Sequence, residues 1–294
     1  MTNEKIIFAL GFFDGVHLGH QALLRECRLM AEHLGCCPGA VTFEMHPKAR
    51  FLKTPPVLIS TLADRVRLLK GYGMEKVTVL PVSDKVMSTT WQEFYSMLRS
   101  QGAAGFVCGE DFRFGRGGEG NARLLAERCA RDDIPCVIVP EQTLHGVRVS
   151  STYIRQQIES GDMATAVKFL GHPYVLTGRV VPGKQLGRRL GIPTANLQLP
   201  KGLAIPKFGV YACWALVDGV RYAAVTNIGI RPTVSGQGIT VEPWLLDYSG
   251  DLYGQEITLE FHRFLRPEQK FESLEALKAA IHEDAAKTRR LLQI

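Results

Sequence analysis

The spacing of apolar and polar residues changes character along the chain. In the first half, short unbroken apolar runs alternate with stretches whose apolar residues recur every three or four positions; the runs are Ile6–Leu10, Val77–Pro81 and Cys136–Val139. Unbroken runs are typical of strands buried on both faces, and the intervening stretches predict helices. The alternation predicts an α/β domain in which helices cover both faces of a parallel sheet.

The stretch over residues 21–34 gives the clearest helix prediction. Its apolar residues fall on one face, and Gly35 follows as a residue that ends helices. That face consists of Leu23, Leu24, Cys27, Met30 and Leu34.

From Tyr174 onward the pattern predicts one strand after another. Residues 210–217 and 220–226 flank Asp218-Gly219, a preferred hairpin turn, and residues 256–262 alternate between apolar and polar. This half is predicted to form a small antiparallel β-barrel. The last segment, residues 273–292, predicts a helix that packs on the barrel through Leu274, Leu277, Ile281 and Ala285. We expect two domains, residues 1–172 and 173–294.

Composition narrows the class of protein. With 294 residues, 46% of them hydrophobic and 22% charged, the chain can bury a substantial core. The longest early apolar run, Ile6–Phe13, is too short for a bilayer, and no basic leader accompanies it, so we expect a cytoplasmic protein without a membrane partner. Seven cysteines without a metal-type spacing favour reduced thiols. The net charge of +6 includes no basic tract, so no nucleic-acid partner is expected, while anionic small substrates would suit it.

The sequence GFFDGVHLGH, residues 11–20, is the first candidate site. It follows a predicted strand directly and opens a predicted helix, with His17 and His20 three residues apart. Ligands of open α/β sheets bind at the carboxyl ends of the strands, and a helix N-terminus favours phosphate. On these residues alone, the histidines could equally be surface or capping residues.

Three further stretches have more than one reading. In VSSTYIR, residues 149–155, the serines could cap a helix or bind phosphate. Residues 115–120 match G-x-G-x-x-G, but a polar loop precedes them and no suitably placed acidic residue follows, which argues against a dinucleotide site. Residues 178–184 match the start of a P-loop, but Gln185 occupies the magnesium-ligand position and the glycines Gly187 and Gly191 oppose a following helix.

Taken together, residues 11–20 and SSTYIR resemble the HxGH nucleotidylyltransferases. The resemblance implies a Rossmann-like domain in which His17, His20 and Arg155 are catalytic. It also implies that the phosphates of ATP are bound by residues of the two motifs, namely Gly11, Phe13, Asp14, Ser151 and Thr152.

Two other segments resemble the bifunctional riboflavin kinase/FMN adenylyltransferase family, also called FAD synthetase. GEDFRFG, residues 109–115, is similar to a family loop, which implies that Asp111 and Phe112 bind flavin. TFEMHP, residues 42–47, is similar to another family segment. Phe12 and Met45 stand where the family usually has asparagine and proline.

The second half carries three motifs of the riboflavin kinase module. GRVVPGKQLGRRLGIPTANL, residues 178–197, implies that Gly183 and Gly187 approach phosphate and that Thr194 and Asn196 bind the metal of Mg²⁺-ATP. VEPWLLDYSGDLYG, residues 241–254, implies that Glu242 is the catalytic base, although Pro243 and Trp244 replace the commoner threonine and histidine. FLRPEQKF, residues 264–271, implies that Arg266 binds flavin.

The resemblance extends from Gly11 to the last helix and implies two reactions. The barrel would phosphorylate riboflavin with ATP to give FMN, and the α/β domain would adenylylate FMN to FAD with release of pyrophosphate. Riboflavin, FMN, FAD and ATP are the expected ligands, and Mg²⁺ is the expected cofactor. Alternatives are a chain that retains one activity, a catalytically decayed flavin- or nucleotide-binding regulator, or a cytidylyl- or other adenylyltransferase with an accessory barrel, which would leave PTAN unexplained. The oligomeric state stays open.

Overall fold

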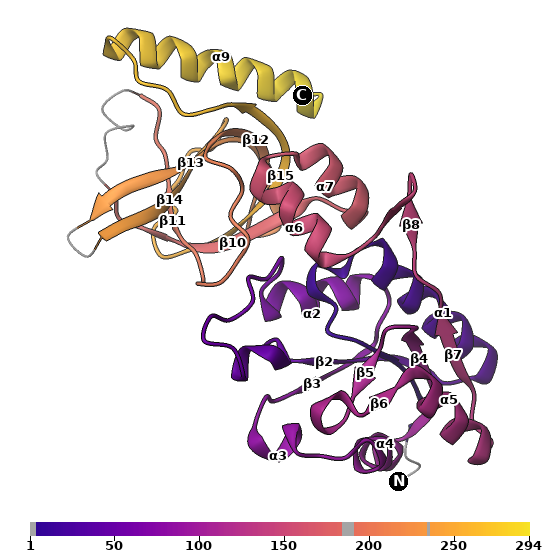
Figure 1. Ribbon diagram of the computed structural model, residues 1–294. Coiled ribbons are helices and arrows are strands. Elements are labelled where there is room, and N and C mark those ends of the chain that lie inside the picture. The colour runs from indigo at the N-terminus through magenta and orange to yellow at the C-terminus, as the bar shows by residue number, and fades with distance from the viewer. Residues whose placement is uncertain (1–3, 184–190, 234–235) are drawn as a thin grey trace. The chain divides into compact units, whose positions relative to one another are not determined.

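A five-stranded parallel sheet forms the centre of the N-terminal half. The computed structural model describes residues 4–183, 191–233 and 236–294, and it divides into two units, Met1–Ser151 and Thr152–Ile294 (Figure 1). The sheet has the strand order β3-β2-β1-β4-β7, and all of its pairings are parallel, as predicted. Its strands are β1 (Ile6–Leu10), β2 (Cys37–Phe43), β3 (Lys76–Leu80), β4 (Ala103–Gly109) and β7 (Cys136–Val139).

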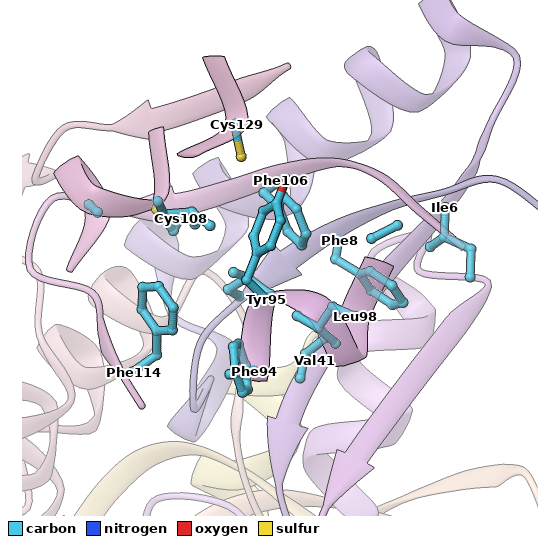
Figure 2. Packing of buried hydrophobic residues seen from close by; sticks show 14 of the residues in the cluster. Ile6, Phe8, Val41, Phe94, Tyr95, Leu98, Phe106, Cys108, Phe114 and Cys129 are labelled. Carbon is cyan, nitrogen blue, oxygen red and sulfur yellow. The ribbon is translucent and has the colours of Figure 1, made fainter. Parts of the chain in front are cut away.

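Helices cover both faces of this sheet. Alternate residues of the fully buried β1 enter two different apolar clusters. Ile7 and Ala9 lie in the cluster shared with α1 (Leu18–Leu34) and α2 (Leu62–Gly71). Phe8 lies in the cluster shared with α4 (Trp91–Ser100) and α5 (Ala122–Arg131). Figure 2 shows this second cluster, in which side chains of α4 lie beside those of the sheet.

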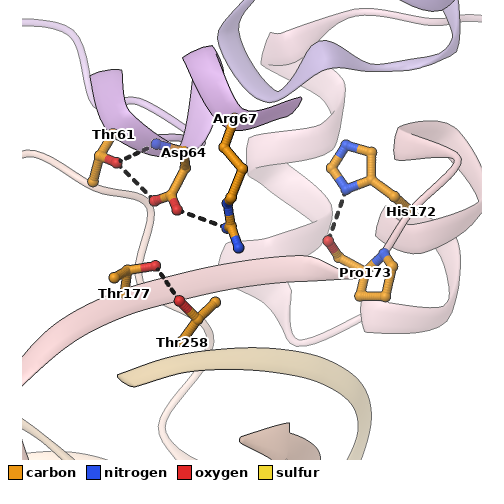
Figure 3. Close-up of polar contacts among 7 residues, drawn as sticks. All are labelled: Thr61, Asp64, Arg67, His172, Pro173, Thr177 and Thr258. Atoms are coloured by element: carbon orange, nitrogen blue, oxygen red, sulfur yellow. Dashed lines mark hydrogen bonds and ion pairs between the residues drawn. The ribbon is translucent and has the colours of Figure 1, made fainter. Parts of the chain in front are cut away.

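Helix α2 begins at a capped turn. The Thr61 hydroxyl accepts a hydrogen bond from the backbone N–H of Asp64 at 3.0 Å and donates one to the Asp64 carboxylate at 2.7 Å. Arg67 also donates to that carboxylate, at 2.8 Å (Figure 3). These bonds fix the first turn of the helix, in which Arg65 lies.

Short elements fill the connections of the N-terminal unit. They are the helix α3 (Asp84–Met87), the strands β5 (Arg113–Phe114), β6 (Gly120–Asn121), β8 (Thr143–Leu144) and β9 (Val147–Arg148), and the 3₁₀ helices Asp14–Val16, Pro47–Arg50 and Arg116–Gly118. All seven cysteines are described and none of them forms a disulfide.

The C-terminal unit begins with two helices, α6 (Ser151–Ser160) and α7 (Met163–Leu170). The turn between them packs on the barrel, because a Cβ on Gly161 would lie 3.1 Å from Cβ of Lys207. The division between the two units falls between Ser151 and Thr152, at the start of α6, whereas the boundary predicted from the sequence follows α7. That later boundary stays a prediction about how the activities are divided.

Six antiparallel strands form a nearly closed barrel, as predicted. Their order is β11-β10-β15-β12-β13-β14, and the backbone N–H of Ala195, just before β11, donates to the Pro243 carbonyl of β14 at 2.9 Å across the remaining gap. Asp218 and Gly219 form the predicted hairpin turn, with φ angles of 49° and 80°. The strands are β10 (Tyr174–Val181), β11 (Asn196–Gln198), β12 (Gly209–Val217), β13 (Val220–Thr233), β14 (Gly236–Leu245) and β15 (Glu256–Arg266).

The terminal helix α9 (Leu274–Leu292) packs on the barrel through its second half. Asp284, Ala285 and Thr288 are buried, and Ala285 joins an apolar cluster with β12 and β13. Leu274 is 54% exposed, so its predicted packing is wrong. Leu34 of α1, at 44% exposed, is a similar error, because both residues lie in the end turn of a helix, beyond the surface that the helix covers. In the described residues, no helix has the length and apolarity needed to cross a membrane.

Candidate functional site: a histidine loop and a barrel cavity

The loop after β1 turns sharply before it enters α1. Phe13, Gly15 and Val16 have positive φ angles of 60°, 75° and 41°. Glycine is required at position 15, because a Cβ there would lie 2.8 Å from the Ile59 side chain. The turn brings the N-terminus of α1 to the carboxyl end of the central strand, where α/β sheets bind ligands.

Asp14 fixes the shape of this loop. Its buried carboxylate accepts hydrogen bonds from the backbone N–H of Ile59 at 2.9 Å and of Ser60 at 3.1 Å. The Ser60 hydroxyl in turn accepts a bond from the backbone N–H of Gly15 at 3.0 Å. The carboxylate thus points into the protein, and the predicted contribution of Asp14 to phosphate binding would act through the backbone.

The two histidines of the loop stack on each other. Their rings are 3.6 Å apart and 14° from parallel, and Nδ1 of His17 accepts the backbone N–H of His20 at 3.3 Å. In neutral His17 this bond places the proton on Nε2, which is then a donor. Gly19 makes room for the stack, because a Cβ there would lie 3.2 Å from the His17 ring.

His20 is held in its neutral form. Burial lowers its pKa well below 6.5, and the charges of His17 and Arg65 lower the pKa further. The side chain as a whole is partly exposed, but its Nδ1 is enclosed and has no hydrogen-bond partner in the described part of the chain. A neutral imidazole can still donate one N–H to a phosphate group that arrives with its own charge.

Ser151 lies beside the histidine loop. Its hydroxyl donates to the Asp14 carbonyl at 3.0 Å, which joins residues from opposite ends of the N-terminal unit. Thr152 and Arg155, the next predicted phosphate ligands, belong to the second unit. There the Arg155 guanidinium donates to the Thr152 hydroxyl at 3.1 Å.

The predicted flavin residues of the N-terminal unit lie between β4 and β5. The Asp111 carboxylate forms an ion pair with Arg148 of β9 at 2.9 Å, and Arg148 also pairs with Glu141 at 2.6 Å. The Phe112 ring stacks on that of Phe114, with centroids 5.3 Å apart. These contacts order the loop, and its contact with flavin stays a prediction.

A cavity of about 100 Å³ opens in the barrel next to the PTAN segment. Thr194 lines it, and so do an acidic and an aromatic residue of the loop after β14, Asp251 and Tyr253. Asn196 packs against the backbone of Gly183, where a Cβ would clash with the asparagine amide. The structure therefore brings Thr194, Asn196 and Gly183 to one region of the barrel, whereas Gly187 lies outside the described residues.

Glu242 lies on β14, next to Pro243, whose carbonyl accepts the hydrogen bond from Ala195 of the PTAN segment. It is half-buried and stands opposite Asn227 of β13. The Asn227 amide donates to the Glu268 carboxylate at 3.4 Å. Directly opposed residues of an antiparallel pair share one face, so Glu242 and Asn227 project to the same side of the barrel wall.

Arg266 anchors α9. Its Nε and one terminal nitrogen bind the Asp284 carboxylate at 2.9 and 2.8 Å, and its guanidinium lies 5.5 Å from the Phe271 ring centre. The other terminal nitrogen donates to the Pro267 carbonyl at 3.3 Å. These bonds use three of the five N–H donors of the guanidinium, so the predicted contact of Arg266 with flavin would rely on the remaining two.

Two residues near the sites were missed by the sequence reasoning. Arg65 is fully buried beneath the histidine loop, and its only local signal is an arginine on an amphipathic helix. Asp251 lines the barrel cavity. It belongs to the motif at residues 241–254, but the motif alone did not indicate a role for it.

The fold and the sites define a class of protein. Two stacked histidines, of which His20 is held neutral, lie at a helix N-terminus at the carboxyl end of a parallel strand, and this arrangement suits the transfer of a nucleotidyl group. The barrel carries a cavity beside the PTAN segment, and a strand glutamate lies next to a residue that bonds the same segment, which suits phosphoryl transfer. The chain is therefore a two-domain nucleotide-dependent transferase.

Comparisons with known proteins identify the family. The sequence profile described as FAD synthetase matches residues 1–153, and that described as riboflavin kinase matches residues 170–292. A bifunctional riboflavin kinase/FMN adenylyltransferase of Pseudomonas fluorescens is 38% identical over 97% of this chain and 92% of its own length. One of Escherichia coli K12 is 37% identical over 96% and 91%. The chain belongs to the bifunctional riboflavin kinase/FMN adenylyltransferase family, as the sequence motifs predicted.

A solved structure shares the fold of the whole chain. A crystal structure described as a macrolide-efflux protein from Streptococcus pneumoniae has a TM-score of 0.89 at 32% identity, and the match covers 98% of this chain and 95% of that one. Both the parallel α/β unit and the barrel unit thus follow an established architecture.

Proposed function

We propose that the chain makes FAD from riboflavin in two steps at two separate sites. The barrel transfers the terminal phosphoryl group of ATP to the 5′-hydroxyl of riboflavin and gives FMN. The α/β domain transfers AMP from a second ATP to FMN and releases pyrophosphate. The observation that supports this division best is that each unit carries its own constellation, the stacked histidines in one and Glu242 beside the PTAN segment in the other.

In adenylyl transfer the attacking group is a phosphate that is already ionised. The reaction therefore needs no strong base, and its difficulty is the negative charge that accumulates on the departing pyrophosphate. We assign His17 Nε2 and His20 as donors to that charge, together with the N-terminus of α1. Ser151 is proposed as a further phosphate ligand, and its hydroxyl would have to turn from the Asp14 carbonyl to donate to the phosphate. Gly11, Phe13 and Asp14 shape the loop whose backbone meets the phosphates, and Thr152 and Arg155 remain proposed phosphate ligands.

Phosphorylation of a hydroxyl has the additional requirement of a base. We assign this role to Glu242, which accepts the 5′-hydroxyl proton as the oxygen attacks the terminal phosphorus. Its half-buried position on β14, next to the bond between Pro243 and Ala195, keeps it beside the PTAN segment.

Mg²⁺ is the proposed cofactor of both steps. Magnesium keeps several waters and binds through few protein oxygens plus the phosphates of its substrate. The oxygens proposed to hold it are those of Thr194 and Asp251, which line the cavity, and of Asn196, which lies against Gly183. When bound, the ion neutralises charge on the phosphates of ATP.

The remaining assignments also stay proposals. Asp111, Phe112 and Arg266 are proposed to contribute to flavin binding, the last by holding α9 in place. The functional boundary is proposed at residues 172 and 173, because Thr152 and Arg155 precede it. The unpaired thiols and the modest charge support a cytoplasmic protein that binds small ligands and no nucleic acid.

Incubation with riboflavin, ATP and MgCl₂, followed by chromatography of the flavins, tests the proposal. We expect FMN to appear first and FAD to follow. FMN as the only product would contradict the assignment of the α/β domain and leave a chain with one activity. Unchanged riboflavin would contradict the assignment of the barrel, and supplied FMN would then test the other domain independently.

A further inference from the structure

Arg65 is a buried cation whose hydrogen-bond partners, among the residues that the structure describes, are all carbonyl groups. It lies on α2, is 0% exposed, and donates to the Phe12 carbonyl at 3.2 Å and to the Phe43 carbonyl at 2.6 Å. A weaker contact reaches the Glu44 carbonyl at 3.5 Å. Burial lowers the pKa of Arg65 to about 10, against the opposing effect of the Asp14 charge, so the group stays charged at neutral pH.

These carbonyls lie at the carboxyl ends of two neighbouring strands. Phe43 ends β2, and Phe12 follows β1 by two residues, at the start of the histidine loop. A planar guanidinium can bind both at once through its two terminal nitrogens, which a lysine ammonium cannot do with the same geometry. Arg65 therefore ties the strand ends together where the ligand crevice begins.

The ring of Phe12 is held by the same side chain. The Arg65 guanidinium carbon lies 4.2 Å from its centre, and the His46 ring meets it edge-on at 4.8 Å. The Phe12 carbonyl also accepts the Thr42 hydroxyl at 2.8 Å. Phe12 therefore presents a fixed aromatic side chain at the start of the histidine loop.

The geometry points to Arg65 as a positioning residue for adenylyl transfer, which keeps the loop of His17 and His20 in the shape that receives the phosphates of ATP. This inference rests on the proposed function of the α/β domain. Arg65 touches no reacting atom in this account, because it acts through the backbone and the ring of Phe12. A purely structural role would instead lower stability without a specific effect on one reaction.

The test compares Arg65→Met, Arg65→Lys and a matched control, Arg128→Met, in the full chain. Arg128 is also an arginine over an aromatic ring, 5.0 Å from the centre of Tyr95, with Asp132 as its ion-pair partner, but it lies on α5, on the other face of the sheet. The readouts are kcat and KM for FMN adenylylation, and riboflavin phosphorylation in the same sample as a measure of folded protein.

We expect Arg65→Met to lower kcat of adenylylation about 100-fold, the scale of loss for a misplacement of about 1 Å. Arg65→Lys, which keeps the charge but loses the planar fork, should lose about tenfold in kcat with little change in KM for FMN. Phosphorylation by both variants, and both reactions of Arg128→Met, should stay within about twofold of wild type.

Two results would overturn the inference. One is that the Arg65 variants adenylylate FMN as well as Arg128→Met does. The other is that they lose both reactions in parallel. Should Arg65→Met fail to fold, the lysine variant decides alone by the same criteria. A wild-type protein that makes no FAD from supplied FMN would contradict the proposed function itself, before any variant is compared.

Discussion

Replacing Asp284 by leucine should loosen the terminal helix from the barrel. The Asp284 side chain is 2% exposed, and its carboxylate is bound by Arg266, whose side chain is 18% exposed. The substitution leaves the guanidinium without this partner. Removal of one member of a buried ion pair lowers the free energy of unfolding by about 3–5 kcal/mol. Because Arg266 is partly in contact with water, we expect a loss at the lower end of this range, about 3 kcal/mol.

The double variant Arg266→Met/Asp284→Leu separates the unpaired charge from lost packing. Replacement of a buried pair by apolar groups of similar volume is often neutral, so the double variant should lose less than about 1 kcal/mol. Urea unfolding followed by tryptophan fluorescence measures both variants, because Trp214 and Trp244 pack in the same apolar cluster as Ala285 of α9.

The KM for riboflavin then decides how Arg266 serves flavin binding. If it acts only by holding α9, the stable double variant should keep the wild-type KM, whereas a direct contact would leave KM raised. The reasoning is refuted if Asp284→Leu loses less than about 1 kcal/mol, or if the double variant is as unstable as the single one.

The histidine loop yields two more predictions. Gly19→Ala should displace the His17 ring, which would lie 3.2 Å from the new Cβ, and should lower the rate of adenylylation at least about tenfold while phosphorylation is kept. Gly71→Ala is the control, because a Cβ there has no neighbour within 4 Å. Equal effects of the two substitutions would contradict the role of the histidine stack. Below pH of about 6.5 the unfolded chain protonates His20 more readily than the folded one, since burial lowers its folded pKa. The free energy of unfolding should therefore decrease as the pH decreases, and this group contributes at most about 1.4 kcal/mol per pH unit. In a pH series of urea unfolding curves, His20→Asn should show a smaller change of the free energy of unfolding with pH. An unchanged slope would contradict the depressed pKa.

Local signals were enough to predict the main architecture. The unbroken run Ile6–Leu10 predicted β1, and Asp218-Gly219 predicted the β12–β13 hairpin, because burial of both strand faces and a positive-φ turn each require particular residue types. The pairing of His17 with His20 also follows from their spacing at the start of one helix.

Long-range partners could not be predicted in the same way. The carboxylate of Asp14 binds backbone groups of residues 59 and 60, some 45 positions away, and nothing in the local pattern around Asp14 encodes that turn. Arg65 reaches the Phe12 carbonyl across 53 positions, and an arginine on an amphipathic helix usually lies at the surface. Packing of the α6–α7 turn on Lys207 likewise depends on tertiary contacts, which leave no signal in the local composition.

Each half of the chain is proposed to perform one reaction with its own residues. FMN formation from riboflavin and FAD formation from supplied FMN are to be measured in Glu242→Gln and His20→Asn. The control variants are Glu256→Gln, at an exposed residue of β15, and His33→Asn, at an exposed residue of α1. Glu242→Gln should lose about 100-fold or more in FMN formation and keep FAD formation, and His20→Asn should show the reverse with a loss of about 100-fold. Folded variants that lose both reactions equally, or neither, would contradict the account.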